Sequence, residues 1–344
     1  LPDITKGHWV FGDESESWWS WCEERKPYSL GYAEAFIIFE EGLPYYPLLK
    51  KSETGTMMNP RIVQGWFTAD ELVEAKKWPH STFIIGEWMR FTEDDESIRP
   101  YRNFISKFYE IKMNSAKDSV EYKVAKQLLN SIYGKTIQAT NNSAGKLYNP
   151  MYASVICGGT RARLAELIRL NDFKALSVAT DGIIFEKDDL KIIPDRPLDA
   201  PFNLGNWELE EEGDLVIIMS GVYSMKNPDF VKTTFRGSAS YHLKNYASQG
   251  GLFRFCEDFK NKRKVTTTYK RPYSAKEARV RNDLGLMNRF EEMKFSFSAV
   301  GDSKKRLWLE QLPITFGDLL NKWFTSSPHR ELEKPSLLGV NYDE

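Results

Sequence analysis

The chain has 344 residues, enough for a large core and about two or three subdomains. Charged residues make up 28% of the sequence and hydrophobic residues 41%. This composition is that of an ordinary globular protein, so disorder is not the default expectation. The net charge of −1 excludes a uniformly basic nucleic-acid binder, so any basic surface must be local. Cys22, Cys157 and Cys256 are far apart, which predicts a reduced, cytoplasmic protein without disulfides or a zinc site. No apolar run reaches the roughly 18 residues that span a bilayer, and we expect no membrane partner.

The N-terminal third of the chain predicts two strand regions separated by a helix. Residues 31–49 are expected to form a strand, a Glu-Gly turn and a second strand. The segment 68–78 is expected to be a helix that opens with a capping box of Thr68 and Glu71. The segment 81–91 is rich in β-forming residues and predicts another strand.

The middle of the chain predicts helices. Two are expected at about 98–113 and 118–133, with Gly134 as the C-terminal cap of the second. The segment 151–170 predicts a third long helix, weakened by its internal Gly-Gly pair.

The second half predicts mainly strands and then a mixed basic region. In chain order we expect a β-hairpin at 174–189, a solvated acidic loop at 208–214, a second hairpin formed by 214–225 and 230–235 with its turn at Asn227-Pro228-Asp229, and a basic region from about 250. Strands and helices therefore occur in separate blocks, which predicts the α+β class.

The helix expected before Gly134 has two different faces. At about 100° per residue, Lys126, Asn130 and Tyr133 lie on one front, with Lys123 beside them. Apolar residues form the back of the helix, namely Val120, Val124, Ala125, Leu128 and Ile132. The front could be a solvated amphipathic surface. Its cation, amide and phenol also suit a nucleotide, because lysine binds phosphate and a tyrosine ring packs on a sugar or base.

The stretch "KQLLNSIYGK" resembles motif B of family B DNA polymerases, which reads Lys, three residues, Asn-Ser, one residue, Tyr-Gly. All five fixed positions match, at Lys126, Asn130, Ser131, Tyr133 and Gly134. The resemblance implies that this helix lies in the fingers of a polymerase. It implies further that Lys126 binds the phosphates of the incoming nucleotide and that Tyr133 packs under its sugar and excludes ribose.

The tip of the first hairpin, "ATDG" at 179–182, is similar to motif C of the same family, Asp-Thr-Asp. It differs at one position, because Ala179 replaces the first aspartate. The resemblance implies that Asp181 is a ligand of two Mg²⁺ ions, with Mn²⁺ as an alternative, and a catalytic residue together with Lys126 and Tyr133. Taken alone, an Asp-Gly pair between β-branched runs is better explained by a structural turn, and the complete motif B nearby reverses this preference.

Other segments are similar to the phage-type, protein-primed branch of the family. The helix "YASVICGGTRARL" carries Arg161 at the position of the branch's basic residue, and "SGVYSMKNPDFVKTTFRGSA" resembles the strand pair that grips the primer terminus. Tyr223 matches that pair, but Gly221 occupies the usual lysine position. The resemblance therefore implies three substitute DNA-binding residues: Lys226, Lys232 and Arg236.

Motif A, which supplies the principal catalytic aspartate of the family, is not found in these residues. The opening "LPDITKGHW" resembles the segment on the C-terminal side of motif A, so we expect the motif just before Leu1 and the exonuclease domain to be missing. A cropped or split polymerase is expected, inactive as this chain alone. A second polypeptide supplying motif A and the exonuclease, or a terminal protein, is an expected partner besides primer-template DNA and dNTP.

Residues 260–281 hold nine Lys or Arg against the single acid Glu277. A solvated surface is one explanation; contact with the duplex backbone is the other. The candidate contacts are Lys262, Arg263, Lys264, Lys270 and Arg271.

The resemblance implies the right-hand fold of a polymerase with no exonuclease domain. The expected parts are palm at 1–96, fingers at 97–148, palm at 149–245 and thumb at 246–344. Two functions stay open at this point, template-directed DNA synthesis by a two-metal mechanism and a catalytically inactive, polymerase-derived DNA-binding subunit. A metal-dependent nuclease around Asp181 lacks the further acids that it needs.

Overall fold

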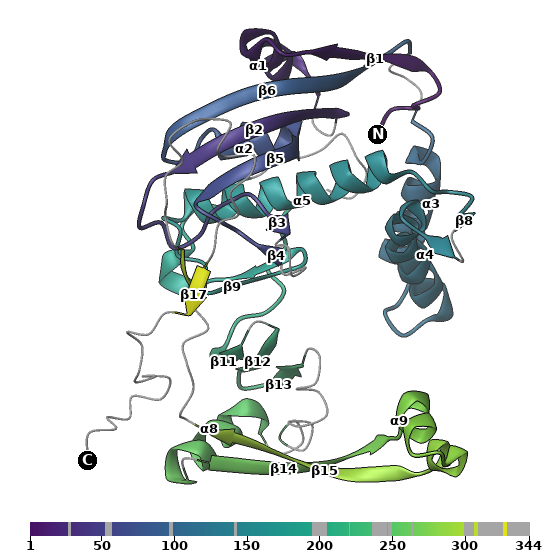
Figure 1. Cartoon of the computed structure of the whole chain (residues 1–344), viewed down its shortest axis with the longest axis vertical. Helices are drawn as coiled ribbons and strands as arrows, with labels where there is room; N and C mark the ends of the chain where they lie inside the picture. The colour runs from purple at the N-terminus through teal and green to yellow at the C-terminus, as the bar shows by residue number, and fades with distance from the viewer. Residues whose placement is uncertain are drawn as a thin grey trace. The chain divides into compact units, whose positions relative to one another are not determined.

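The chain divides into two compact units, Leu1–Glu208 (unit 1) and Leu209–Glu344 (unit 2), in the computed structural model (Figure 1). The structure describes residues 1–26, 29–51, 57–95, 99–140, 143–194, 205–219, 221–235, 246, 250–262, 264–298, 306–308 and 326–328. All strand pairs within these residues are antiparallel, and strands and helices occur in blocks, so the predicted α+β class is confirmed. None of the helices in these ranges is long and apolar enough to cross a membrane.

Unit 1 combines a long antiparallel sheet with helices. Its described elements, in chain order, are β1 (Gly7–Gly12), α1 (Ser15–Glu24), β2 (Gly31–Phe39), β3 (Lys50–Lys51), β4 (Met57–Met58), β5 (Ile62–Thr68), α2 (Ala69–Ala75), β6 (His80–Glu93), α3 (Arg102–Asn114), α4 (Val120–Thr136), β7 (Ala139–Thr140), β8 (Ser143–Ala144), α5 (Pro150–Leu170), β9 (Ser177–Ala179), β10 (Gly182–Ile184) and the 3₁₀ helix η1 (Lys187–Asp189).

The core of unit 1 is a four-stranded sheet in the order β1-β6-β2-β5 with helices packed against it (Figure 1). Strand β2 lies in the interior of the sheet, and Ile37 pairs with Val63 of β5 and with Phe83 of β6. Ile37 and Val63 share one buried cluster with Leu72 of α2 and Ile168 of α5. Burial of these side chains against the sheet fixes the position of α2 and α5, and α5 carries residues of the candidate site.

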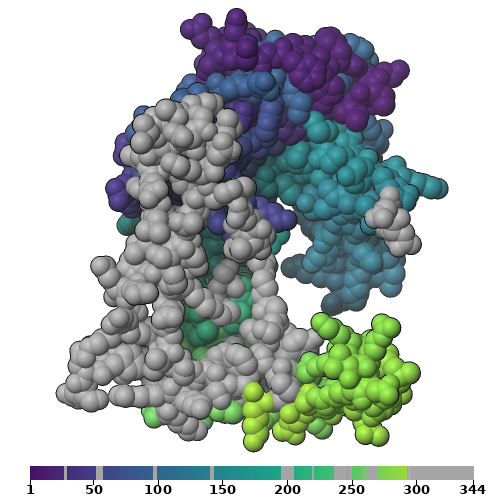
Figure 2. All heavy atoms as spheres, in the orientation of Figure 1, coloured from purple at the N-terminus to yellow at the C-terminus, as the bar shows by residue number. Residues whose placement is uncertain are grey.

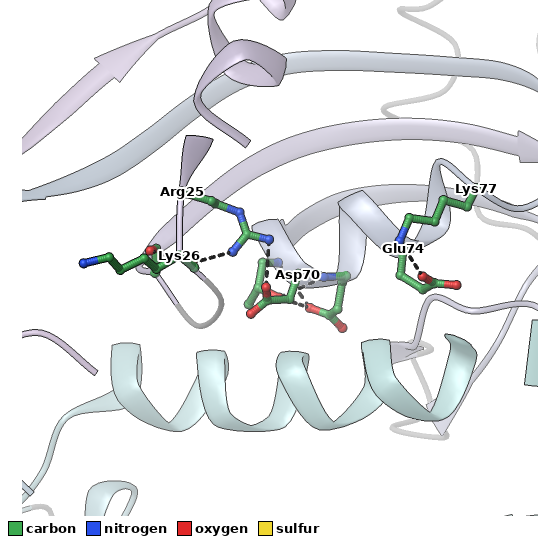
Figure 3. A network of polar contacts seen from close by, with 8 residues as sticks. Arg25, Lys26, Asp70, Glu74 and Lys77 are labelled. Carbon is green, nitrogen blue, oxygen red and sulfur yellow. Dashed lines mark hydrogen bonds and ion pairs between the residues drawn. The ribbon is translucent and has the colours of Figure 1, made fainter. Parts of the chain in front are cut away.

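Helix α2 begins with the predicted capping box. The Thr68 hydroxyl accepts a hydrogen bond from the Glu71 amide, and the Glu71 carboxylate accepts one from the Thr68 amide at 3.1 Å. The acidic residues of α2 also hold three arginines from other elements at 2.7 Å: Asp70 with Arg25, Glu71 with Arg161, and Glu74 with Arg169. Figure 3 shows Arg25 reaching Asp70 at the start of this helix, and Glu74 with Lys77 further along it. These ion pairs tie α2 to α5 and to the end of α1.

Helix α5 is continuous through its Gly-Gly pair, so the two glycines do not interrupt the helix. A Cβ atom added to Gly158 would lie 2.2 Å from Thr68 Oγ1 and 2.9 Å from Glu71 Oε2. Glycine at this position therefore allows α5 to approach the capped start of α2 closely, and no other residue would fit there without movement.

The paired helices α3 and α4 agree with the two predicted helices, with one correction. Helix α4 runs through Gly134 and ends at Thr136, so the expected glycine cap was wrong. The predicted apolar back is only partly buried, because Ala125 is 1% exposed whereas Val120 is 70% and Val124 47% exposed. In Figure 2 the blue atoms of α3 and α4 stand out to one side of the sheet-bearing part of unit 1.

Two further expectations for unit 1 need correction. The second strand expected within 31–49 is not a strand, because Pro44 and Pro47 cannot donate ladder hydrogen bonds. The tyrosines between them pack instead, Tyr45 against Trp78 with ring centroids 6.0 Å apart. Strand β1 and helix α1, which precede that segment, were not predicted from the sequence.

Unit 2 is built mainly from hairpins. Its described elements are β11 (Asp214–Met219), β12 (Val222–Lys226), β13 (Val231–Thr234), α8 (Gly251–Lys262), β14 (Lys264–Pro272), α9 (Ala275–Val280), the 3₁₀ helix η3 (Leu284–Asn288), β15 (Phe290–Ser298), β16 (Arg306–Trp308) and β17 (Ser326–Pro328).

The strands β11, β12 and β13 form a three-stranded meander. The turn expected at Asn227-Pro228-Asp229 is confirmed, since the Asn227 carboxamide oxygen accepts from the amides of Asp229 and Phe230. The segment 214–225 is two strands rather than the single strand expected, because the chain reverses at Gly221, which has φ of 72°. Helix α8 contacts all three strands of the meander, and β14 and β15 form a separate long ribbon.

Candidate active site

The front of α4 carries the four residues that were predicted from the sequence to bind a nucleotide. The Ser119 hydroxyl caps the helix by accepting from the Tyr122 amide at 3.1 Å. Lys123, Lys126 and Asn130 are exposed, and Lys126 Nζ lies 6.0 Å from the centre of the Tyr122 ring. Their helical spacing places these groups on one side of α4, where a ligand could reach a cation and an amide together.

Tyr133 completes this front and is partly buried. Its phenol oxygen accepts a hydrogen bond from the Cys157 thiol of α5, with 3.0 Å between Sγ and Oη. The contact with Cys157, followed by burial, raises the pKa of Tyr133 above its ordinary value. Tyr133 therefore stays a neutral phenol at physiological pH, and its ring is connected to the body of unit 1.

Arg161 lies one turn beyond Cys157 on α5. Its Nε donates to Glu71 Oε1 at 2.7 Å, and the Glu71 side chain is 4% exposed. The positive charge of Arg161 also acts on the Tyr133 phenol, where it lowers the pKa and so opposes the rise caused by Cys157 and burial. Arg161 was predicted to bind DNA, whereas the structure shows its guanidinium paired with Glu71 inside unit 1.

Asp181 lies at the tip of the β9–β10 hairpin, as predicted. Ala179 pairs with Gly182, which leaves Thr180 and Asp181 as the two loop residues, and Thr180 has a positive φ of 60°. The flanking Val178 and Ile183 pack against the main core of unit 1. This packing holds an exposed carboxylate at a defined position on the surface.

A metal site at Asp181 would need further ligands. Among the described residues, no group of three or more His, Cys, Asp and Glu side chains is arranged to hold a metal ion. A two-metal site requires carboxylates from separate strands, so the described residues around Asp181 do not by themselves fit such a site.

The strand pair assigned to the primer terminus is the β12–β13 hairpin of unit 2. Tyr223 is partly buried on β12, and Lys226 is exposed at its end. Lys232 donates to Glu211 at 2.7 Å and lies 3.4 Å from Glu210. The hydrogen bond with Glu211 raises the pKa of Lys232. The sequence predicted that the acidic loop would be solvated. The structure shows instead that two of its carboxylates neutralise the charge of Lys232, one of the candidate DNA contacts.

Several candidate DNA contacts lie on or near the β14–β15 ribbon. Arg271 pairs with Glu277 and Glu291, and hydrogen bonds from Ser274 and Arg271 hold the pKa of Glu277 at about 2. Lys270 is exposed and pairs in register with Glu292. Glu291 and Glu292 of β15 lie outside the basic segment 260–281 in sequence. In the ribbon they lie opposite Arg271 and Lys270 and offset part of its positive charge. Lys262 ends α8 and Lys264 begins β14, whereas Arg236 and Arg263 lie outside the described residues.

Comparisons with known proteins agree with the motifs. Residues 13–151 match the model of a family described as DNA polymerase type B, organellar and viral. The Primer-independent DNA polymerase PolB of Escherichia coli is 26% identical over 196 residues, which are 50% of this chain and 22% of that protein. A Probable DNA polymerase of Ascobolus immersus is 38% identical over 72 residues, 21% of this chain and 6% of that protein.

The fold agrees as well. The structure of Phi29 DNA polymerase complexed with primer-template DNA matches with a TM-score of 0.54 and 15% identity, over 85% of this chain and 53% of that chain. The chain thus has the fold of a DNA polymerase. The resemblance to family B DNA polymerases, inferred above from motifs B and C, is confirmed, and so is the resemblance to their phage-type, protein-primed-like branch, inferred from the helix with Arg161 and the strand pair with Tyr223. The chain spans about a fifth of the bacterial relative and about half of the Phi29 polymerase.

Proposed function

We propose that the chain takes part in template-directed DNA synthesis, by transfer of a nucleotidyl group from a dNTP to a primer 3′-hydroxyl or to a hydroxyl of a priming protein. The observation that carries the proposal is the complete front of α4, where Lys126, Asn130 and Tyr133 lie on one side of a single helix. The match of residues 13–151 to a DNA polymerase family supports the same conclusion.

Each group on this front has a chemical role. Lys126, with Lys123 beside it, attracts the triphosphate, and an exposed ammonium is a suitable point charge for phosphate oxygens. Tyr133 packs its ring against the sugar of the nucleotide. Asn130 holds the base edge or the adjoining backbone through its amide. Together they bind and orient the nucleotide, which lowers the barrier of the transfer by proximity.

Asp181 is the residue that we assign to metal binding. Mg²⁺ or Mn²⁺ supplies charge neutralisation at the transferred phosphate when it is bound. Because Asp181 alone does not fit a two-metal site, we propose that a further carboxylate comes from outside the described residues or from a second polypeptide. The purified chain is then expected to extend primers poorly by itself.

The DNA contacts of the proposal lie in unit 2. Tyr223, Lys226 and Arg236 steady the primer terminus, and Lys232 joins them once its acidic partners are displaced. The basic residues of 260–281 hold the duplex backbone without reading sequence. In this proposal residues 1–96 and 149–245 form the palm, 97–148 the fingers and 246–344 the thumb.

The test is formation of a ternary complex. Fluorescence anisotropy measures binding of a dideoxy-terminated primer-template to the chain with each dNTP and Mg²⁺ in turn. We expect the nucleotide that pairs with the next template base to tighten DNA binding about tenfold, or by about 1.4 kcal/mol. Lys126→Ala and Tyr133→Ala should abolish this gain and leave binding to DNA alone unchanged.

The matched control is Lys135→Ala, which removes an exposed lysine from the opposite side of α4. The control should behave as the unmodified chain does. DNA binding that is the same with all four nucleotides would contradict the proposal and favour a DNA-binding subunit without a nucleotide site.

A further inference from the structure

The β9–β10 hairpin belongs to a lobe of the chain whose two ends meet at one side chain. Asn171 directly follows α5 and is fully buried. Its carboxamide oxygen accepts hydrogen bonds from the amides of Lys191 at 2.6 Å and Ile192 at 2.9 Å. Its carboxamide nitrogen donates to the carbonyl oxygens of Ile192 and Leu167, both at 2.8 Å. Asn171 therefore closes the neck of a lobe formed by residues 172–190.

These four hydrogen bonds use the full capacity of the asparagine side chain. A carboxamide has two donor hydrogens and an oxygen with two acceptor lone pairs, and in Asn171 all of them have partners. Because the side chain is 0% exposed, the bonds are shielded from water, and loss of the side chain would leave buried backbone groups unpaired. The tie between the end of α5 and the exit of the lobe is thus strong and has a defined geometry.

The chain enters the lobe through a strained turn. Asp172 and Phe173 have positive φ values of 55° and 61°. Residues other than glycine persist in this conformation only where the surrounding structure enforces it, and such residues cluster at functional sites. Here the Phe173 amide donates to the Ile168 carbonyl at 2.9 Å, and its ring packs on Trp78 with 4.8 Å between centroids. The direction in which the chain leaves α5 is therefore imposed by its contacts.

Two ion pairs also cross the neck, but they contribute less. Lys174 pairs with Asp189 at 2.7 Å, and Lys191 pairs with Asp172 at 3.1 Å. The lysine side chains are 48% and 57% exposed, so water screens both pairs. Most of the polar stabilisation of the neck therefore comes from the buried Asn171.

The hairpin within the lobe is small. Strands β9 and β10 pair over three residues each, and a two-stranded hairpin is at most marginally stable by itself. Val178 and Ile183 pack against the main core and hold the hairpin on unit 1. The direction of the hairpin also depends on how the chain enters and leaves it. The neck of the lobe therefore helps to determine where Asp181, at the tip, lies.

We propose that Asn171 is a positioning residue for Asp181: it fixes the direction of the β9–β10 hairpin from the end of α5 and so the place of the carboxylate at its tip. The inference rests on the proposed function, in which Asp181 acts in nucleotidyl transfer. Reacting groups must be held to about 0.5 Å, which requires support from residues that do not touch the substrate. Asn171 gives this support without contacting nucleotide or DNA.

Hydrogen exchange of the full chain, followed by mass spectrometry, tests the effect on the hairpin. Asn171→Ala removes all four hydrogen bonds. Asn171→Ser is the milder variant, because its hydroxyl can still donate to the Leu167 carbonyl within α5 but is too short to hold Ile192 as well. We expect amide exchange of 174–185 to rise about tenfold in either variant, while exchange of β2 and α2 stays unchanged. If the alanine variant does not fold, the serine variant decides the test.

The matched control is Asn149→Ala, at the opposite end of α5. Asn149 caps the start of the helix by accepting a hydrogen bond from the Tyr152 amide at 3.1 Å. The control therefore removes an asparagine from the same helix without touching the lobe. It should leave exchange of the hairpin as it is in the unmodified chain.

A double-mutant cycle in the ternary-complex assay, with Mg²⁺ and the templated dNTP, separates positioning from a general structural effect. Asp181→Ala and Asn171→Ser should each reduce the nucleotide-dependent gain in DNA affinity about threefold and leave binding to DNA alone unchanged. In the Asp181→Ala background, Asn171→Ser should have no further effect, because it acts through that carboxylate. A general structural role would lower the gain in both backgrounds.

Three results would overturn the inference. The first is hairpin exchange that is unchanged in the Asn171 variants, and the second is an equal loss of the gain with and without the Asp181 carboxylate. In both cases the proposed function stands and only the positioning role fails. The third is an Asp181→Ala variant with the full gain, which removes the role of Asp181 as well. If the unmodified chain forms no nucleotide-dependent complex, the proposed function fails and the inference fails with it.

Discussion

The contact between α5 and the start of α2 makes a sharp prediction for two glycines. Gly158→Ala places a methyl group 2.2 Å from Thr68 Oγ1 and 2.9 Å from Glu71 Oε2, well inside contact distance. Overpacking of this kind costs roughly 1–3 kcal/mol, and disruption of the Thr68 cap adds about 1 kcal/mol. Alanine returns about 1 kcal/mol through its higher helix propensity. We therefore predict a net loss of about 2 kcal/mol in the free energy of unfolding.

Gly134→Ala is the matched change on α4 and should act in the opposite direction. Nothing lies within 4 Å of a Cβ atom added there, and Gly134 is inside the helix. The variant should gain about 1 kcal/mol from helix propensity. The two substitutions are chemically identical, so the difference of about 3 kcal/mol isolates the close approach of α5 to α2.

Urea unfolding followed by tryptophan fluorescence measures both variants. Every tryptophan except Trp308 and Trp323 lies in unit 1, so the signal reports mainly on the unit that contains both glycines. The predicted clash would be refuted if Gly158→Ala were as stable as the unmodified chain, or if Gly134→Ala were destabilised to the same extent.

Three other predictions concern charged and titratable groups. The Glu210→Gln, Glu211→Gln double variant should strengthen DNA binding about threefold to tenfold in the anisotropy assay, because it frees Lys232, and the gain should vanish in a Lys232→Met background. Glu74→Ala should lower the stability of unit 1 by about 2 kcal/mol in the urea assay, because it leaves an arginine of α5 without its carboxylate. Burial raises the pKa of Cys22 to about 11 from an unperturbed value of 9.0. The neutral thiol is thus favoured in the folded state, so its contribution to stability is complete below pH 9 and is lost as the pH rises towards 11. The fall in unfolding free energy between these pH values should be smaller in Cys22→Ala.

Each of these predictions has a result that would contradict it. The double variant Glu208→Gln, Asp229→Asn removes the same charge without touching Lys232, and an equal gain in DNA affinity would show a general charge effect. An unchanged urea midpoint in Glu74→Ala would mean that the ion pair of Glu74 with Arg169 adds nothing to stability. Identical pH profiles for Cys22→Ala and the unmodified chain would contradict the raised thiol pKa.

Local sequence signals predicted much of unit 1. The capping box of Thr68 and Glu71, the long strand after α2 and the helices of the middle segment depend on short-range patterns, and the structure contains them. The front of α4 was predictable for the same reason, because it depends only on helical spacing. The failed strand near Tyr45 had a local signal too, in the prolines on either side, but its aromatic and apolar residues were given more weight.

The unpredicted features depend on contacts between distant segments. Gly158 was expected only to weaken its helix. Its close contact with Thr68 was not predicted, because Thr68 is 90 residues away in sequence. The contact between Cys157 and Tyr133 and the ion pair of Arg161 likewise appear only when α2, α4 and α5 are packed together. In unit 2, the acids that pair with Lys232 were visible in the sequence, but the strand order that brings them together was not.

If this chain takes part in DNA synthesis directed by a template, the template base must decide which nucleotide it binds. The most direct measurement is the ternary-complex assay with two primer-templates that differ only in the next template base. If that base is dA, dTTP should tighten DNA binding most, and when it is changed to dC the preference should switch to dGTP. A nucleotide preference that stays the same when the template base changes, or no preference at all, would contradict the account.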